Sequence, residues 1–159
     1  MKLVILILIF SLNLLFPKSV DDLLNFGNFN VEVVKQTKIS SFTGEDGELL
    51  KPSKRDLQFY ELELQITANE SGEFCLYPHM FSGMFYYRDV PRVIKASALG
   101  TKVKENKVVK EYWYTLPDVS VAIEVEKGES FKRYIILEIP KEVKSFKLIG
   151  PSEIGMVKL

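Results

Sequence analysis

The chain has 159 residues, of which 47% are hydrophobic, 12% aromatic and 26% charged, a composition typical of globular proteins. This length allows one domain that buries a core without disulfide or metal crosslinks. Lysine plus arginine and aspartate plus glutamate each total 21, so no global charge is available to attract nucleic acid or an anionic membrane. The composition argues against a nucleic-acid partner.

The N-terminus carries an apolar segment. Residues 1–19, MKLVILILIFSLNLLFPKS, have one early lysine and an apolar stretch from Leu3 to Phe16 that only Ser11 and Asn13 interrupt. As a helix this stretch would cover about 21 Å, which is short of the ~30 Å hydrocarbon core of a bilayer. The pattern predicts a secretory signal, although no cleavage site of the A-x-A kind follows it.

Three interpretations of residues 1–19 stay open: a cleaved signal peptide, a short retained anchor in the inner membrane, or a buried helix of a cytosolic fold. The first two predict a secreted or periplasmic protein, with membrane contact only through residues 1–19 if they are retained. Residues 20–28 are expected to form a short helix or linker, since two aspartates lie in the first turn and Gly27 ends the pattern. The globular domain is predicted to span 29–159.

Beyond residue 28 the hydrophobic pattern has a period of two, which is typical of strands with one face buried. Residues 56–70 give the clearest case, because Glu61, Glu63 and Gln65 alternate with apolar residues. Glycines and prolines separate the segments, so the sequence predicts an all-β fold, a single antiparallel β-sandwich of about seven to nine strands. Further strands are expected at 29–39, 73–77, 84–88, 92–98, 107–116, 119–125, 131–139 and 145–150.

The segments 119–125 and 131–139 are separated by a turn. If they form a hairpin, a three-residue loop ending at Gly128 gives the glycine a left-handed conformation and sets Ile123 opposite Phe131. The same register places an arginine opposite a core valine. The alternative, in which the two strands belong to different sheets, therefore stays open.

The segment 43–56, TGEDGELLKPSKRD, is polar and contains two glycines and a proline, so we expect a long surface loop. Its three acidic residues lack the spaced oxygen ligands of a calcium loop.

Residues 74–89, FCLYPHMFSGMFYYRD, hold the only cysteine, the only histidine and six of the nineteen aromatic residues. Cys75 cannot form an intramolecular disulfide, and together with His79 it falls short of the about four ligands of a zinc site. We expect Cys75 to be a small buried strand residue and His79 to be structural or at the surface. Neither a metal nor a cofactor is predicted.

Two aromatic pairs are the candidate contacts for a partner. Alternate residues of a strand face opposite ways, so Tyr86 and Tyr87 point to opposite faces, as do Tyr112 and Trp113. One ring of each pair can fill the core while the other lies at the surface, where tyrosine and tryptophan are common in binding patches.

No residue is selected as catalytic. Glu61 with Glu63, and Glu124 with Glu126, are the same-face carboxylates of predicted strands, and their simplest role is to form a solvated face. Two carboxylates could also serve as acid and base in a small extracytoplasmic hydrolase, which is the alternative function. The sequence contains no glycine-rich phosphate loop, nucleophile elbow or zinc-protease helix.

Two runs carry a family resemblance: QFYELELQITANESGE (58–73) and VEKGESFKRYIILEIPKEVKSFKLI (125–149). Their order resembles the immunoglobulin-like extracellular domains of unknown function found in secreted proteins and lipoproteins of bacteria and archaea. The resemblance covers about residues 29–150 and implies an immunoglobulin-like sandwich with an accessory, adhesive or binding role in the cell envelope. It supplies no functional residues. The chain lacks the family's lipid-attachment cysteine, and residues 74–114 have no counterpart.

Together these patterns predict an exported, non-enzymatic binding or structural module of the cell envelope. Its partner is expected to be an unknown protein or envelope component.

Overall fold

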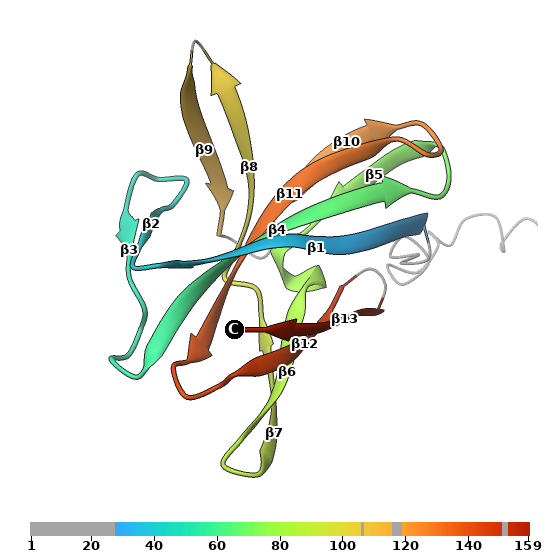
Figure 1. Ribbon diagram of the computed structural model, residues 1–159. Helices are drawn as coiled ribbons and strands as arrows, with labels where there is room; N and C mark the ends of the chain where they lie inside the picture. Colours follow the sequence, from blue (N-terminus) through green and yellow to red (C-terminus); the bar gives the residue numbers. More distant parts are fainter. Residues whose placement is uncertain (1–27, 106, 116–118, 151–152) are drawn as a thin grey trace, which may run out of the picture.

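The computed structural model describes residues 28–105, 107–115, 119–150 and 153–159 (Figure 1). The predicted signal or anchor at 1–19 and nearly all of the predicted helix or linker at 20–28 lie outside these residues. Within the described ranges, no helix has the length and hydropathy needed to cross a membrane.

The described residues form an all-β fold, as the sequence predicts, with thirteen strands and one short 3₁₀ turn. The number of strands exceeds the prediction because the segment expected at 92–98 is divided between two strands, and because 42–50 and 153–158 also pair. The elements are β1 (Phe29–Ile39), β2 (Phe42–Thr43), β3 (Leu49–Leu50), β4 (Leu57–Ala68), β5 (Gly72–Leu76), η2 (Pro78–Met80), β6 (Ser82–Tyr87), β7 (Val90–Lys95), β8 (Ala98–Glu105), β9 (Val108–Tyr114), β10 (Val121–Val125), β11 (Ser130–Pro140), β12 (Ser145–Ile149) and β13 (Glu153–Lys158).

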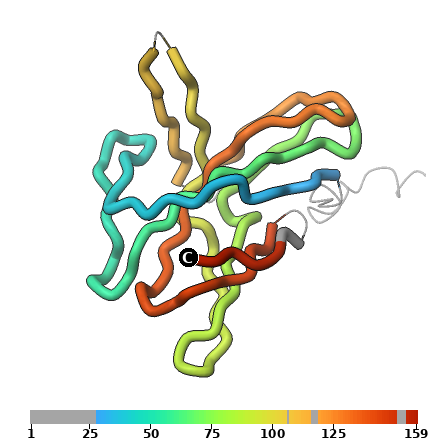
Figure 2. Tube along the Cα trace, in the orientation of Figure 1, coloured from blue at the N-terminus to red at the C-terminus, as the bar shows by residue number. Residues whose placement is uncertain are grey.

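All strands except β2 and β3 form two antiparallel layers, which can be followed in Figures 1 and 2. One layer is a five-stranded sheet in the order β1-β4-β11-β8-β9. The other contains a four-stranded sheet in the order β13-β12-β6-β7 and the strand pair β10-β5. Side chains of both layers meet in one apolar cluster, whose fully buried members include Leu62, Leu64, Ile66, Leu76, Leu99, Ile135, Leu137, Ile139, Phe146 and Leu148.

The predicted alternation in β4 is confirmed. Its even-numbered residues from Tyr60 to Ala68 are buried, whereas Glu61, Glu63 and Gln65 lie on the opposite face. Burial of one leucine or isoleucine side chain stabilises a fold by about 1.5–3 kcal/mol relative to leaving it exposed. This strand, which pairs along its whole length with β1 and β11, therefore anchors the core.

β1 changes face halfway along its length. The register runs from Val33 opposite Leu64 to Lys35 opposite Glu63, with an irregularity between them that inserts one extra residue. Phe29, Val31 and Val33 before this bulge point toward the main core, whereas Ile39 after it contacts apolar residues on the other face of the same sheet.

That other face carries a second, smaller apolar cluster. The segment predicted as a surface loop contains the short hairpin β2-β3, which packs over this face through Phe42 and the partly buried Leu50. Exposed polar residues make up most of the segment. The buried members of this second cluster are Phe42, Phe59, Ala98, Trp113 and Ile136.

The predicted hairpin between 119–125 and 131–139 is wrong, and the alternative assignment to different sheets is correct. β10 pairs with β5, so that Ile123 lies opposite Phe74. β11 pairs with β4 and β8, so that Phe131 lies opposite Ile66. The predicted left-handed conformation of Gly128 is confirmed, with φ of 84°.

The turn at Gly128 crosses between the layers instead of closing a hairpin. The amide of Gly128 donates to the carbonyl of Ala68 at 2.8 Å, and the amide of Ala68 donates to the carbonyl of Glu129 at 2.9 Å. The amide of Lys127 donates to Oγ of Ser71 at 2.8 Å. These bonds join the β10-β11 connection to the β4-β5 connection. The two connections therefore pass from one layer to the other side by side.

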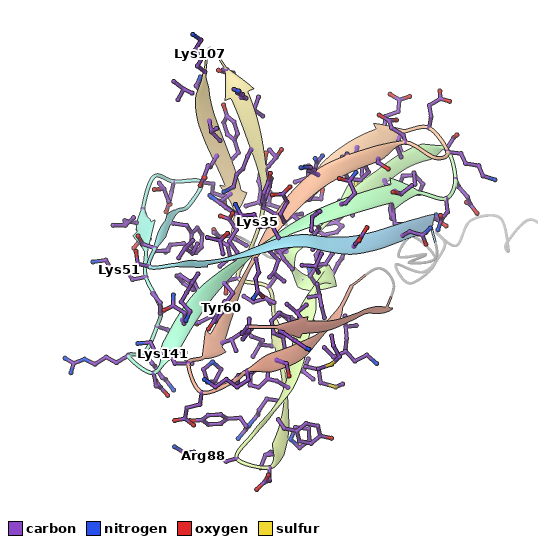
Figure 3. All side chains as sticks on the ribbon, viewed as in Figure 1. Lys35, Lys51, Tyr60, Arg88, Lys107 and Lys141 are labelled. Atoms are coloured by element: carbon purple, nitrogen blue, oxygen red, sulfur yellow. The ribbon has the colours of Figure 1, made fainter. Side chains whose placement is uncertain are left out.

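Two hairpins project from opposite ends of the molecule (Figure 1). β6 and β7 are joined by Arg88 and Asp89, whose φ values of 51° and 61° are typical of a two-residue turn. β8 and β9 form the other projection, with Lys107 at φ 69° near its tip. Figure 3 labels Arg88 and Lys107 at these two tips.

Candidate interaction surface

The solvent face of the four-stranded sheet carries a band of apolar side chains. Residues that lie opposite each other in antiparallel strands point to the same face, and Met156, Lys147, Met84 and Val93 are opposite one another across β13, β12, β6 and β7. At about 4.8 Å between strands, this row is about 14 Å wide. We call the apolar residues on this side the outer β6 face: Met84, Tyr86, Pro91, Val93, Ile149 and Met156.

Most residues of the outer β6 face are open to solvent, and Met84 is partly buried. Tyr86 is 73% exposed, Met156 67% and Val93 62%. Their strand neighbours Phe85 and Phe146 are buried in the main core, which fixes the orientation of the sheet. Contiguous exposed apolar side chains are typical of sites that bind another molecule.

The structure separates the four aromatic residues predicted as partner contacts. Tyr86 lies on the outer β6 face, whereas Tyr87 is partly buried against the main core, with the guanidinium of Arg88 5.1 Å from the centre of its ring. Tyr112 is 44% exposed, and Trp113, at 3%, is buried in the second apolar cluster. The opposed orientation within each pair is as predicted, but the two pairs lie on different projecting hairpins and form no common patch.

Sequence reasoning did not single out the other members of the outer β6 face. Val93 and Pro91 alternate with Arg92 and Ile94, which is the expected strand pattern, but the pattern does not show which neighbour β7 pairs with. Met156 belongs to a strand that the sequence did not predict. A Tyr, a Val and two Met residues become one surface only through the pairing of four strands.

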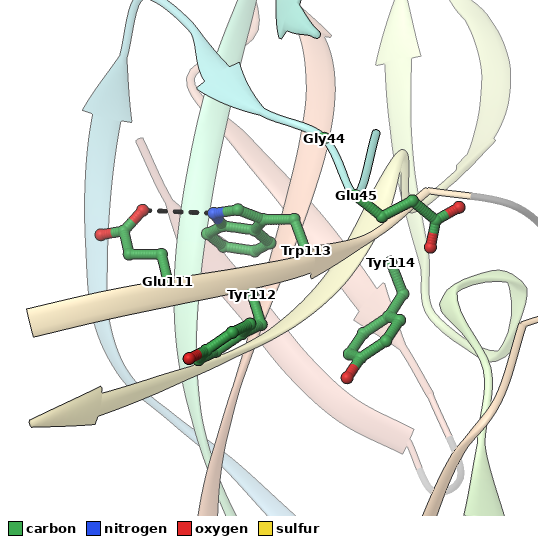
Figure 4. Close-up of a pocket in the computed structure, with 6 residues that line it drawn as sticks. All are labelled: Gly44, Glu45, Glu111, Tyr112, Trp113 and Tyr114. Atoms are coloured by element: carbon green, nitrogen blue, oxygen red, sulfur yellow. Dashed lines mark hydrogen bonds between the residues drawn. The ribbon is translucent and has the colours of Figure 1, made fainter. Parts of the chain in front are cut away.

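A pocket of about 190 Å³ lies between the turn after β2 and the free edge of β9 (Figure 4). Trp113 is one of the lining residues, and its Nε1 donates a hydrogen bond to Oε2 of Glu111 at 3.2 Å. In Figure 4 the carboxylates of Glu45 and Glu111 lie at opposite ends of the pocket and point away from each other. Its lining residues are Gly44, Glu45, Glu111, Tyr112, Trp113 and Tyr114.

Lys102 holds the carboxylate beside this pocket. Its Nζ lies 2.8 Å from Oε1 of Glu111 and 2.7 Å from Oε1 of Glu61. Burial acts to raise the pKa of Glu111, but the hydrogen bonds donated by Lys102 and Trp113 hold that pKa below its usual value. Burial acts to lower the pKa of Lys102, and the two glutamates raise it above its usual value. Glu111 is therefore a charged partner of Lys102. It does not have the raised pKa that a general acid needs.

Two of the four carboxylates considered for hydrolysis, Glu61 and Glu63, also form ion pairs with lysines. Glu61 pairs with Lys102, and Oε1 of Glu63 lies 2.6 Å from Nζ of Lys132. Both pairs lie on the outer face of the five-stranded sheet. Across the parts of the chain that the structure describes, no three His, Cys, Asp or Glu side chains come together as metal ligands.

The expectation that Cys75 is buried is wrong, because the thiol is exposed. β5 pairs with β10 alone, and Phe74 and Leu76 on either side of the cysteine point into the core. Alternation along the strand then turns Cys75 toward solvent. His79 lies in η2, with its ring centroid 5.2 Å from that of Tyr77.

Comparison of the chain with family models, with curated proteins and with solved structures finds no match.

Proposed function

We propose that this chain is an exported, immunoglobulin-like β-sandwich that acts as a non-enzymatic binding or structural module of the cell envelope. In this proposal the partner contacts the outer β6 face. The observation that carries it is the set of exposed apolar side chains on this face, of which Tyr86 is 73% exposed, Met156 67% and Val93 62%, on three of the four paired strands. Tyrosine offers a large apolar surface and a polar hydroxyl, and is enriched where proteins bind partners.

The immunoglobulin-like assignment is supported by connectivity. β4 lies beside β11, and β12 beside β6, so neighbours in each sheet are far apart in the sequence. Crossing connections of this kind between two antiparallel layers occur in sandwiches with Greek-key topology. The apolar pattern of residues 1–19 supports export.

The hydrolase alternative is weaker than the binding proposal. Glu61, Glu63 and Glu111 each lie within 3 Å of a lysine ammonium group, and the hydrogen bonds donated by Lys102 and Trp113 hold the pKa of Glu111 below its usual value. A glycosidase-type mechanism needs one carboxyl group that is protonated near neutral pH and faces its partner across the substrate. The arrangement of these three carboxylates is that of charge pairs on a sheet surface.

A photo-crosslinking amino acid at position 86 tests the contact. We expect irradiation of intact cells to attach a component of the envelope to the variant at position 86, because this side chain projects from the proposed contact face. The same crosslinker at position 49 is the matched control, since Leu49 is also an exposed apolar strand residue, at 57%, but lies in the β2-β3 hairpin.

Adducts at position 86 and none at position 49 would support the outer β6 face as the contact. Equal adducts at both positions, or none at position 86 in a correctly folded protein, would contradict it. Folding is checked for each variant by the midpoint of urea unfolding.

A further inference from the structure

The β6-β7 hairpin carries a net positive charge in a chain that is neutral overall. Three basic residues and one acidic residue occur between Ser82 and Lys95. Arg88 lies at the tip, and Arg92 and Lys95 follow it in β7. All three side chains are exposed. Lys158 adds a further exposed cation at the β13 end of the outer β6 face, opposite Ser145.

The same hairpin exposes apolar side chains on both of its faces. Tyr86 and Val93 belong to the outer β6 face, while Val90, opposite Tyr87 on the other side of the ribbon, is 46% exposed. The hairpin extends beyond the body of the molecule, as Figures 1 and 3 show. Its tip is therefore a wedge and not one edge of a flat surface, with apolar and cationic side chains and the exposed carboxylate of Asp89 around it.

The exposed apolar and charged side chains of the hairpin favour some binding partners over others. The register places Lys95, Lys147 and Lys158 on this face, so two copies packed face to face would bring six lysines into one interface, which opposes self-association. A flat protein partner would cover the outer β6 face but would leave Val90 and Arg92 exposed. The interface of a bilayer surrounds an inserted tip, takes up apolar and tyrosine side chains at headgroup depth, and attracts basic residues when its lipids are anionic.

We propose that the β6-β7 hairpin docks on an anionic phospholipid membrane, with Tyr86 and Val93 at headgroup depth and Arg88, Arg92 and Lys95 facing lipid phosphates. This inference rests on the proposed function and names the envelope component that the outer β6 face contacts. It adds a membrane contact to the one expected of residues 1–19. Because the attraction between exposed charges is screened by salt, the docking should weaken as ionic strength rises.

Position-specific fluorescence on the full chain provides the test. Replacing the only cysteine by Cys75→Ser allows one new cysteine, Tyr86→Cys or Leu49→Cys, to carry an environment-sensitive dye. The dye reports its own surroundings, so anchoring of the chain through residues 1–19 does not produce the signal. The probes are vesicles of phosphatidylcholine alone, and vesicles with about 30% phosphatidylglycerol, which supplies the anionic surface.

We expect a blue shift of the dye at position 86 on the phosphatidylglycerol vesicles, and none at position 49. The shift should disappear between about 100 mM and about 500 mM salt. Charge reversal by Arg88→Glu with Arg92→Glu should raise the lipid concentration needed for half of the shift by at least about tenfold. The matched pair Lys104→Glu and Lys107→Glu, on the hairpin at the other end, should leave it unchanged.

An unshifted dye at position 86 on both vesicles, or a shift that neither salt nor the Arg88 and Arg92 reversals reduce, would overturn the membrane proposal. If an acidic protein is crosslinked at position 86 in cells while the dye stays silent on vesicles, the binding function stands and the lipid partner is wrong. If the dye responds to vesicles but the protein resides in the cytoplasm, the envelope function is wrong.

Discussion

Replacing Trp113 with alanine is expected to lower the free energy of unfolding by about 3–5 kcal/mol, which is the usual cost of removing a buried aromatic ring. The indole is 3% exposed and packs at the centre of the second apolar cluster, with its ring centroid 5.7 Å from that of Phe42. Its loss would leave a cavity on the outer face of the five-stranded sheet and remove one hydrogen bond from Glu111. Urea unfolding at neutral pH measures the change.

Tyr112→Ala is the matched control for this substitution, because Tyr112 is the neighbouring aromatic residue of the same strand and is 44% exposed. We expect its cost to stay within about 1 kcal/mol. Similar costs for the two variants would show that Trp113 does not occupy a buried position. A small effect at Trp113 with a large one at Tyr112 would reverse the assigned faces of β9.

Replacing Gly100 with alanine is expected to destabilise the protein by about 3 kcal/mol, at the upper end of the range for overpacking. A Cβ at this position would lie 2.4 Å from Cε3 of Trp113 and 2.8 Å from the backbone oxygen of Tyr112. The indole can move only by disturbing its cluster, and the carbonyl belongs to the β8-β9 ladder. The absence of a side chain at Gly100 is thus what allows the indole to lie flat against β8.

The matched control is Gly72→Ala, since Gly72 is also in a strand but a Cβ there meets Phe74 at 3.4 Å, an ordinary contact. We expect a change within about 1 kcal/mol for this variant. The double variant Gly100→Ala with Trp113→Ala should cost less than the sum of the two single changes, because it removes the clash with the ring. Additive costs would contradict the contact between the two residues.

The layered all-β fold could be predicted because alternating apolar and polar residues mark strands with one buried face. In β4 the alternation alone identifies the side that enters the main core, whereas the run Ile135 to Leu137 in β11 is buried on both faces of the sheet. The pairing of β10 could not be predicted in the same way. Its partner β5 lies about fifty residues earlier in the sequence, and the pattern of β10 is equally compatible with a hairpin to β11.

The burial of Trp113 could not be predicted from the sequence either, for a physical reason. Both faces of the five-stranded sheet carry apolar clusters, so the run Tyr112 to Tyr114 can place either set of rings inward. The bulge in β1 and the hairpin β2-β3 create the second cluster, and neither has a distinctive local signal. The predicted burial of Cys75 was wrong for a related reason. Its exposure follows from the position of β5 in a two-stranded pair.

The candidate surface could be predicted only in part. The sequence indicated that one of Tyr86 and Tyr87 faces solvent, and the structure identifies it as Tyr86. The remaining members of the outer β6 face come from four strands, and their proximity depends on registers that involve residues more than sixty positions apart. Non-local pairing of this kind leaves no trace in local periodicity.

The central claim, that the domain lies outside the cytoplasm, is tested most directly by the reactivity of the only cysteine. Cys75 is exposed, so a membrane-impermeant maleimide should label it in intact cells after mild reduction, and Cys75→Ser should abolish the labelling. A cytosolic protein with an exposed thiol should stay unlabelled until the cells are lysed. If Cys75 behaves like that cytosolic control and reacts only after lysis, the account of an exported envelope module is contradicted.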